Sequence, residues 1–68
     1  MAQLYYEARK RNGLYRGVVY HYSNIKEDGG EVLDYQSKEC KSLWEALDAA
    51  SQYLDDEGLE AEMMGGEI

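Results

Sequence analysis

The chain has 68 residues and a net charge of −7, with seven Tyr, one Trp and one Cys but neither Pro nor Phe. A chain this short forms one small domain with a modest core. The single Cys excludes an internal disulfide framework and a multi-Cys zinc site, and no apolar run approaches the roughly 20 residues that span a bilayer.

The first half of the chain has the pattern of three β-strands. Residues 3–9 (QLYYEAR) alternate with the period of two that is typical of a half-buried strand. The dipeptide Asn12-Gly13 predicts a type I′ hairpin turn, because both central residues of that turn need positive φ. β-Branched and aromatic residues predict a second strand over 14–23, and residues 24–30 (NIKEDGG) have the composition of a turn. With a shorter third strand over 31–37, the pattern predicts a three-stranded antiparallel meander.

The period then changes to that of an amphipathic helix. Ser42 followed by Glu45 forms a capping box, and Gly58 is a suitable residue just past the helix end because positive φ costs glycine little. These signals predict a helix over residues 43–57 that packs on one face of the sheet. Its buried side would carry Leu43, Ala46, Leu47, Ala50 and Leu54.

The predicted fold class is therefore α+β, a three-stranded antiparallel meander followed by one C-terminal helix (βββα). Residues 1–58 would form the single domain. Residues 59–68 are either an acidic C-terminal tail or a short fourth strand, because Leu59, Ala61 and Met63 alternate with Glu60, Glu62 and Met64.

The second strand indicates which sheet face meets the helix. Gly17 indicates that the helix covers the face on which Gly17 lies, since a helix can approach closely over a residue without a side chain. Arg16 argues against burial of the other face, because a lone charge is costly inside a protein. We therefore expect an open, aromatic face that serves either as a binding surface or only as a source of strand propensity. The candidate binding residues on this face are Tyr5, Arg16, Tyr20 and Tyr22, and Val18 is expected on the same face.

Two segments, YRGV (15–18) and CKSLWEALDAA (40–50), resemble the plant AP2 DNA-binding domain and the arm-binding domain of phage integrases. The resemblance covers residues 4–54 and implies a three-stranded sheet followed by a helix. It also implies DNA reading by Arg and Trp on the open sheet face. This chain offers Arg16 and tyrosines there, and its net charge opposes a polyanion, so we do not expect direct nucleic-acid binding.

No pattern in the sequence indicates catalysis, and we expect a protein that is not an enzyme. His21 is the only His, and we expect it on the core-facing side of the second strand as a hydrogen-bonded structural residue. Cys40 is expected to be a small buried hydrophobe. A Cys40–His21 couple would also need an orienting third group and a pocket. The sequence has no phosphate loop and no calcium-loop spacing, so we expect neither a cofactor nor a metal site.

Charge is unevenly distributed along the chain. Residues 1–39 contain six acids and six bases, whereas residues 40–68 contain eight acids and one base. Asp55, Asp56 and Glu57 crowd the predicted helix C-terminus, where the helix dipole disfavours carboxylates. The acids are either a solvated surface that maintains solubility or a binding surface for a positively charged partner. The candidate binding acids are Glu45, Asp48, Asp55, Asp56, Glu57, Glu60 and Glu62.

A protein that handles nucleic acid is the expected owner of a complementary basic surface. In size, acidity and lack of a catalytic motif, the chain is similar to the phage anti-CRISPR proteins. This resemblance implies a non-enzymatic inhibitor that mimics nucleic acid and blocks a partner such as a CRISPR effector.

Two alternatives remain. One is an AP2-like nucleic-acid-binding module that uses Arg9, Lys10, Arg11 and Arg16 with the open tyrosines, and the other is a small subunit that dimerises through the tyrosine face. Residues 1–11 lack the apolar segment of a secretory signal, so we expect a cytoplasmic protein, in the host cell if a phage encodes it.

Overall fold

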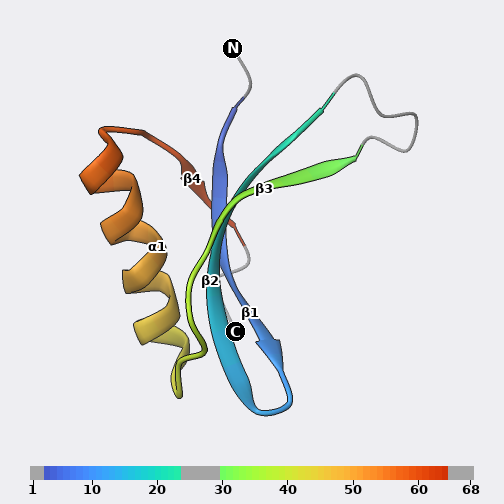
Figure 1. Ribbon diagram of the computed structural model, residues 1–68, viewed down its shortest axis with the longest axis vertical. Coiled ribbons are helices and arrows are strands. Elements are labelled where there is room, and N and C mark those ends of the chain that lie inside the picture. Colours follow the sequence, from blue (N-terminus) through green and yellow to red (C-terminus); the bar gives the residue numbers. More distant parts are fainter. Residues whose placement is uncertain (1–2, 24–29, 65–68) are drawn as a thin grey trace.

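The protein folds as a twisted four-stranded sheet with one helix against one of its faces (Figure 1). The computed structural model describes residues 3–23 and 30–64. The elements are β1 (Tyr5–Arg11), β2 (Leu14–Tyr22), β3 (Glu31–Gln36), α1 (Leu43–Glu57) and β4 (Glu62–Met63). The predicted α+β class is confirmed.

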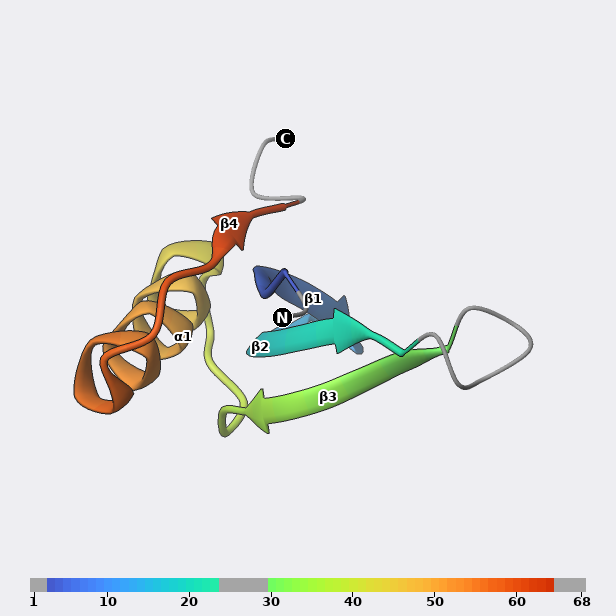
Figure 2. The same cartoon turned by 90° about the horizontal axis from the view of Figure 1, so that it is seen from above.

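The sheet is mixed, and its strand order is β3-β2-β1-β4 (Figure 2). Strands β1 and β2 form the predicted hairpin, with Asn12 at φ 55° and Gly13 at φ 80° in the turn. Strand β3 pairs antiparallel with β2, and the pairing shifts register between Val19 and Tyr20. The predicted turn before β3 falls mostly on residues 24–29, which lie outside the described residues.

The fourth strand corrects the predicted topology. The chain returns after α1, and β4 pairs parallel with the start of β1, where Tyr5 is opposite Glu62 and Tyr6 is opposite Met63. The backbone N–H of Glu62 donates to the Leu4 carbonyl at 3.0 Å. The helix is therefore not the last element, and the sheet has four strands rather than three. Of the two alternatives for residues 59–68, the structure shows the short strand at Glu62–Met63.

Helix α1 begins and ends where its capping signals are. The Glu45 N–H donates to the Ser42 hydroxyl at 3.1 Å, and Gly58 follows the helix in the left-handed conformation at φ 68°. The second half of the predicted capping box differs, because the Glu45 carboxylate accepts from the Ser42 hydroxyl instead of from its backbone N–H. The predicted bounds, residues 43–57, are confirmed.

Gly17 sets the distance between α1 and the sheet. A Cβ at this position would lie 2.0 Å from the Ala46 carbonyl oxygen, so only glycine permits the observed approach. Val19, Ala50 and Leu54 form the core between the two layers. The predicted choice of the helix-covered face is confirmed.

The segment between β3 and α1 runs along β2 and fixes the start of the helix. The Ser37 N–H donates to the Gly17 carbonyl, and its buried hydroxyl accepts from the Gly17 N–H, both at 2.8 Å. Further along, Cys40 and Tyr15 form an isolated antiparallel bridge. At the other end of α1, the ring of Tyr53 stacks on that of Tyr35 with centroids 4.2 Å apart. Both ends of α1 are thus tied to the sheet, which gives its outer face a fixed orientation.

None of the helices in residues 3–23 and 30–64 is long and apolar enough to cross a membrane.

Candidate functional site

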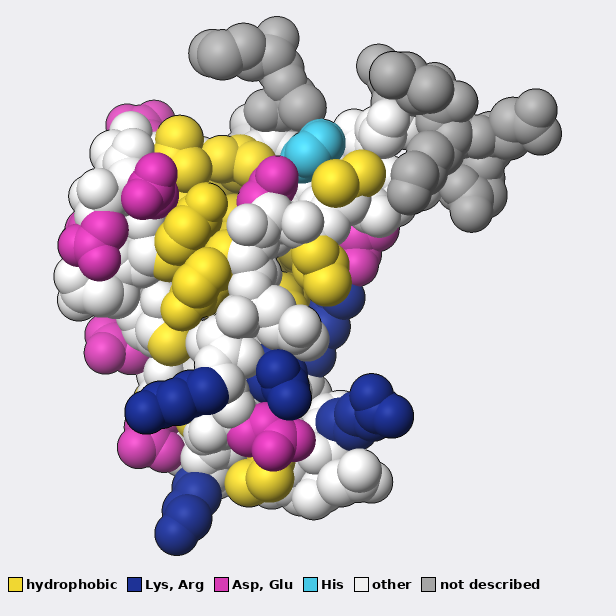
Figure 3. Space-filling model, viewed as in Figure 1, with side chains coloured by type: hydrophobic (Ala, Val, Ile, Leu, Met, Phe, Trp, Pro, Cys, Tyr) yellow, Lys and Arg dark blue, Asp and Glu magenta, His cyan; other side chains and the backbone are white. Residues whose placement is uncertain are grey.

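The outer face of α1 carries a row of carboxylates, which we call the acidic stripe: Glu45, Asp48, Asp55 and Asp56. These residues, with Gln52 between them, recur at helical spacing on the side opposite the buried Ala46, Leu47, Ala50 and Leu54. All four are exposed. At a rise of about 1.5 Å per residue, the stripe extends for roughly 17 Å along the helix. Figure 3 shows acidic side chains spread along α1.

No cation within the described part of the chain neutralises the stripe. The ion pairs among the described residues are made by Arg9, Arg16 and His21, and none of them includes a residue of the stripe. The last turn of α1 contains no basic residue. The polar partners of the stripe are the neutral side chains of Ser42, which donates to Glu45, and Gln52, which donates to Asp56 at 3.2 Å. Lys and Arg side chains gather instead at the hairpin end of the molecule (Figure 3). The acidic side chains extend along the whole of α1, and the negative end of the helix dipole adds to the negative charge at Asp55 and Asp56.

The other three predicted acids are exposed but lie outside the stripe. Glu57 is the last helical residue and lies one turn beyond Tyr53, off the outer face. Glu60 is in the connection between α1 and β4. Glu62 pairs with Tyr5 in the sheet. The structure thus brings together four of the seven acids.

Trp44 is a feature of this region that the sequence reasoning missed. Its side chain is 71% exposed, the largest exposed fraction among the described large hydrophobic residues. It lines a shallow groove with Tyr6, Leu47 and Met63, from α1, β1 and β4. The available signal was its position, because Trp44 falls outside the apolar stripe that Leu43, Ala46, Leu47, Ala50 and Leu54 form.

The open face of the sheet, opposite α1, differs from the expectation. Val18 and Tyr20 are 1% and 3% exposed, although none of the described helices and strands forms a second layer over them. The rings of Tyr5, Tyr20 and Tyr22 form a triangle in which Tyr20 is 5.7 Å from Tyr5 and 5.6 Å from Tyr22, centroid to centroid, and Tyr5 is 5.8 Å from Tyr22. The Arg9 guanidinium lies 5.0 Å above the Tyr20 ring centroid. The prediction that Tyr20 offers an exposed contact surface is therefore wrong, because its neighbours cover it.

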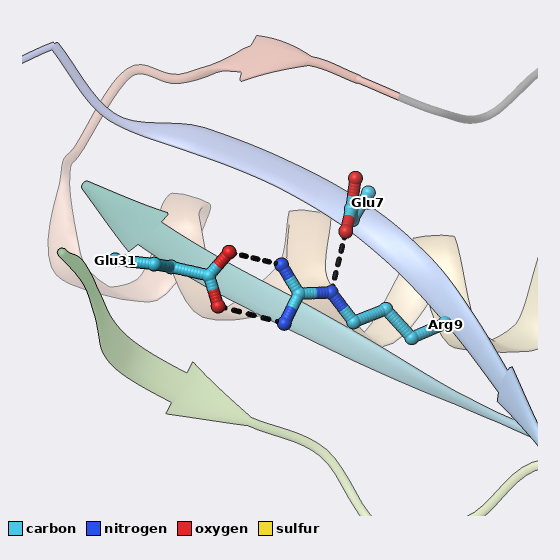
Figure 4. Close-up of polar contacts among 3 residues, drawn as sticks. All are labelled: Glu7, Arg9 and Glu31. Carbon is cyan, nitrogen blue, oxygen red and sulfur yellow. Dashed lines mark hydrogen bonds and ion pairs between the residues drawn. The ribbon is translucent and has the colours of Figure 1, made fainter. Parts of the chain in front are cut away.

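Arg9 holds this cover in place across three strands (Figure 4). Its two terminal nitrogens donate to both oxygens of Glu31, at 2.8 and 2.6 Å, and its Nε donates to Glu7. The bond from Arg9 holds the pKa of Glu31 below its usual range, and the bond to Glu31 raises the pKa of Arg9. Burial, together with the charge of Glu7, raises the pKa of Tyr20 to about 12. Arg9 is a cross-strand clamp in which each of the three guanidinium nitrogens donates to a carboxylate.

The remaining open-face candidates stay accessible. Tyr22 is 51% exposed, and Tyr5 is half-buried beside it. The Arg16 side chain is 41% exposed, donates to the Ser37 carbonyl at 3.3 Å and lies 3.9 Å from a Glu39 carboxylate oxygen. A groove of about 580 Å³ at the hairpin end is lined by Arg9, Lys10, Arg11, Arg16 and Glu39, among others.

His21 and Cys40 do not form a couple. Cys40 bridges to Tyr15, six positions before His21 on an extended strand, which at about 3.3 Å per residue separates them by roughly 20 Å. His21 Nδ1 lies 2.7 Å from Asp34 Oδ2, so this His is hydrogen-bonded as expected, although it is half-buried rather than in the core. Cys40 is also only partly buried, because its bridge lies at the sheet border, and the prediction of a buried Cys is wrong. No group of three or more His, Cys, Asp or Glu that could hold a metal ion occurs among residues 3–23 and 30–64.

Comparison with known proteins finds no matching family model, no similar curated protein and no similar solved structure.

Proposed function

We propose that this protein is a non-enzymatic binding protein whose acidic stripe docks on a positively charged protein surface. The observation that carries the proposal is the alignment of four exposed carboxylates on one rigid helix face, with no cation paired to them in the described chain. The partner we favour is a protein that handles nucleic acid, such as a CRISPR effector in a host cytoplasm. By occupying the partner's basic surface, the protein would block its nucleic acid, as a phage-encoded inhibitor would.

Two physical properties of the stripe suit this role. The helix is anchored at both ends, so little conformational entropy is lost when the carboxylates bind. The negative charge of the stripe also attracts a positively charged surface during approach, and such steering raises association rates by about 10–1,000-fold at low salt. Because exposed charges are screened beyond about 8 Å at physiological ionic strength, the association should weaken steeply with added salt.

Charge reversal on the stripe tests the proposal. The double variant Asp48→Lys/Asp55→Lys changes two exposed residues on the outer helix face, so it should fold normally. Its control, Glu39→Lys/Glu60→Lys, makes the same charge change away from the stripe. Immobilised proteins are exposed to a bacterial lysate treated with nuclease, and captured proteins are identified by mass spectrometry.

We expect wild type and control to capture the same basic, nucleic-acid-binding protein, and the stripe variant to lose it. A duplex DNA or RNA oligonucleotide should then displace that protein from the wild type. Equal capture by both double variants would refute the role of the stripe. Capture that survives 0.5 M NaCl and excess oligonucleotide would refute the mimicry.

A second candidate function rests on the basic groove at the hairpin end. Its lining of Arg9, Lys10, Arg11 and Arg16 would suit an AP2-like nucleic-acid-binding module. Two observations weaken this candidate. Arg9 already pairs with two carboxylates, those of Glu7 and Glu31, and Tyr20 is too buried to stack on a base. A gel shift at low salt that Arg11→Glu abolishes would favour this candidate, and the absence of any shift would remove it.

A homodimer through the tyrosine face is the remaining alternative. Tyr22 and Leu33 are exposed apolar residues on that side of the sheet, at 51% and 45%. Light scattering that gives twice the monomer mass, reduced by Tyr22→Glu, would support the dimer. A monomer mass at all concentrations would exclude it.

A further inference from the structure

The groove between α1 and β4 combines an apolar base with an acidic border. Buried Leu47 and half-buried Tyr6 form its base, and the exposed side chains of Trp44 and Met63 stand on either side of it. Glu45, Asp48 and Ser51 complete the lining, and the groove has a volume of about 530 Å³. Two of its lining residues therefore belong to the acidic stripe.

The exposure of its apolar side chains indicates an unfilled contact site. Trp44 is 71% and Met63 is 53% exposed, and they come from separate elements that converge on the same groove. Trp is among the residues that most often dominate binding energy at protein interfaces, and methionine adapts its shape to different partners. Trp44 and Asp48 are one helical turn apart, so an arginine that stacks on the indole has a carboxylate within the reach of its guanidinium.

We propose that this groove receives a basic amphipathic segment of the partner. One apolar side chain of the segment lies between Trp44 and Met63, and its Lys or Arg residues pair with Asp48, Glu45 and the rest of the stripe. This inference rests on the proposed function and specifies the partner's chemistry, a helix or loop with apolar and basic residues side by side. A groove of this kind would select a segment that has both apolar and basic residues, whereas an acidic surface alone would bind any cation.

Charge complementarity selects this occupant over the others. A second copy that docked groove to groove would bring the carboxylates of two stripes together, in a molecule that already carries a net charge of −7. A nucleic acid or an anionic membrane is repelled by the same carboxylates. A neutral apolar segment would fill the base of the groove but leave Asp48 and Glu45 without a cation.

The experiment uses three synthetic helical peptides of 18 residues as probes. The first has Leu and Arg at amphipathic spacing, the second replaces every Leu by Ser, and the third replaces every Arg by Glu. Trp44 is the only Trp of the chain, so its emission reports directly on the groove. We expect the Leu–Arg peptide to shift this emission to the blue and protect it from acrylamide. The Leu–Glu peptide should have no effect, and the Ser–Arg peptide should bind about tenfold more weakly without the shift.

Variants locate the peptide by anisotropy of a labelled probe. Trp44→Ser should weaken binding of the Leu–Arg peptide about tenfold, whereas Leu33→Ser, which removes an exposed apolar side chain from the opposite face, should leave it unchanged. Both residues are substantially exposed, so neither variant should unfold the protein. Asp48→Lys should weaken binding of both Arg peptides.

The outcomes distinguish this inference from the function beneath it. If the Leu–Arg and Ser–Arg peptides bound equally well and Trp44→Ser did not weaken either, the groove would not be the binding site. The acidic stripe would then remain as the site. Failure of every Arg peptide to bind would overturn both. Two other results would overturn the inference. If light scattering shows a dimer and Trp44 becomes more exposed when that dimer is diluted, the groove is occupied by a second copy. If deletion of residues 65–68 shifts Trp44 emission to the red, the groove is occupied by the chain's own C-terminus.

Discussion

The substitution Gly17→Ala tests how closely α1 is held against the sheet. The added Cβ would lie 2.0 Å from the Ala46 carbonyl oxygen, 3.0 Å from the carbonyl carbon and 3.1 Å from the Ala50 nitrogen. All three are backbone atoms, so no rotamer change relieves the clash. The helix must retreat by about 1 Å before the first contact reaches the closest separation that Cβ atoms tolerate.

That retreat weakens the whole core, which is small. Val19, Ala50 and Leu54 lie between the layers, and a gap of 0.5–1 Å removes roughly a quarter to a half of each dispersion contact. Overpacking of this kind typically costs about 1–3 kcal/mol, and we expect the upper end because the contact is with backbone. In a domain whose core contributes about 3–5 kcal/mol net, most of the stability would be lost.

Urea unfolding followed by circular dichroism measures the effect. With a slope of about 1 kcal/mol/M for a domain of this size, the midpoint should fall by roughly 2–3 M. The double variant Gly17→Ala/Ala46→Gly should be no more stable, because the clashing atom is the Ala46 carbonyl oxygen and not its side chain. A midpoint within 0.5 M of wild type for Gly17→Ala, or recovery in the double variant, would refute this account of the layer spacing.

Three further predictions concern the charged and ionisable groups. Because its pKa is raised from 10.0 to about 12, Tyr20 should still be protonated in the folded protein at pH 11 by ultraviolet absorbance, and stability should fall as the pH rises from 10 towards 12. Ionisation of Tyr20 by pH 11 with the fold intact would contradict this. Because the pKa of Glu31 is lowered, its carboxylate stabilises the fold at neutral pH, and this contribution is lost as the pH falls below about 4.5. Glu31→Gln should therefore destabilise the protein at pH 7 and make the urea midpoint fall less steeply with decreasing pH. An unchanged dependence of the urea midpoint on pH would contradict this. Asp55→Asn/Asp56→Asn should stabilise the protein by about 0.3–1 kcal/mol per site at low salt, because carboxylates are unfavourable at a helix C-terminus, and should weaken partner binding. Glu45→Gln, at the other end of the helix, should destabilise the protein. If the substitutions at the two ends changed the free energy of unfolding in the same direction, the dipole argument would be refuted.

Elements specified by local signals were predictable from the sequence. The Asn12-Gly13 turn and the helix between Ser42 and Gly58 each depend on residues within a few positions of one another. The close approach at Gly17 was also predictable, because glycine weakens a strand interior and is typical of a position where another backbone comes close.

The features that the sequence missed, or left open as it did the fourth strand, depend on contacts between distant parts of the chain. Strand β4 has two residues and forms only because the return from α1 brings Glu62 beside Tyr5. The burial of Tyr20 depends on Arg9, whose partner Glu31 is 22 positions away. In the candidate site, helical spacing could align four of the acids, but the convergence of Trp44 and Met63 required the position of β4.

The short strand β4 also affects how the sheet is bounded. Within the described residues it pairs with the first two residues of β1, and the following residues of that strand, Glu7–Arg11, are mainly charged. The opposite border, β3, carries Glu31 and Asp34 and is interrupted by a register shift in its pairing with β2. Charged, irregular borders discourage the addition of further strands from neighbouring molecules. The two borders of the sheet therefore work against edge-to-edge pairing between copies of this chain.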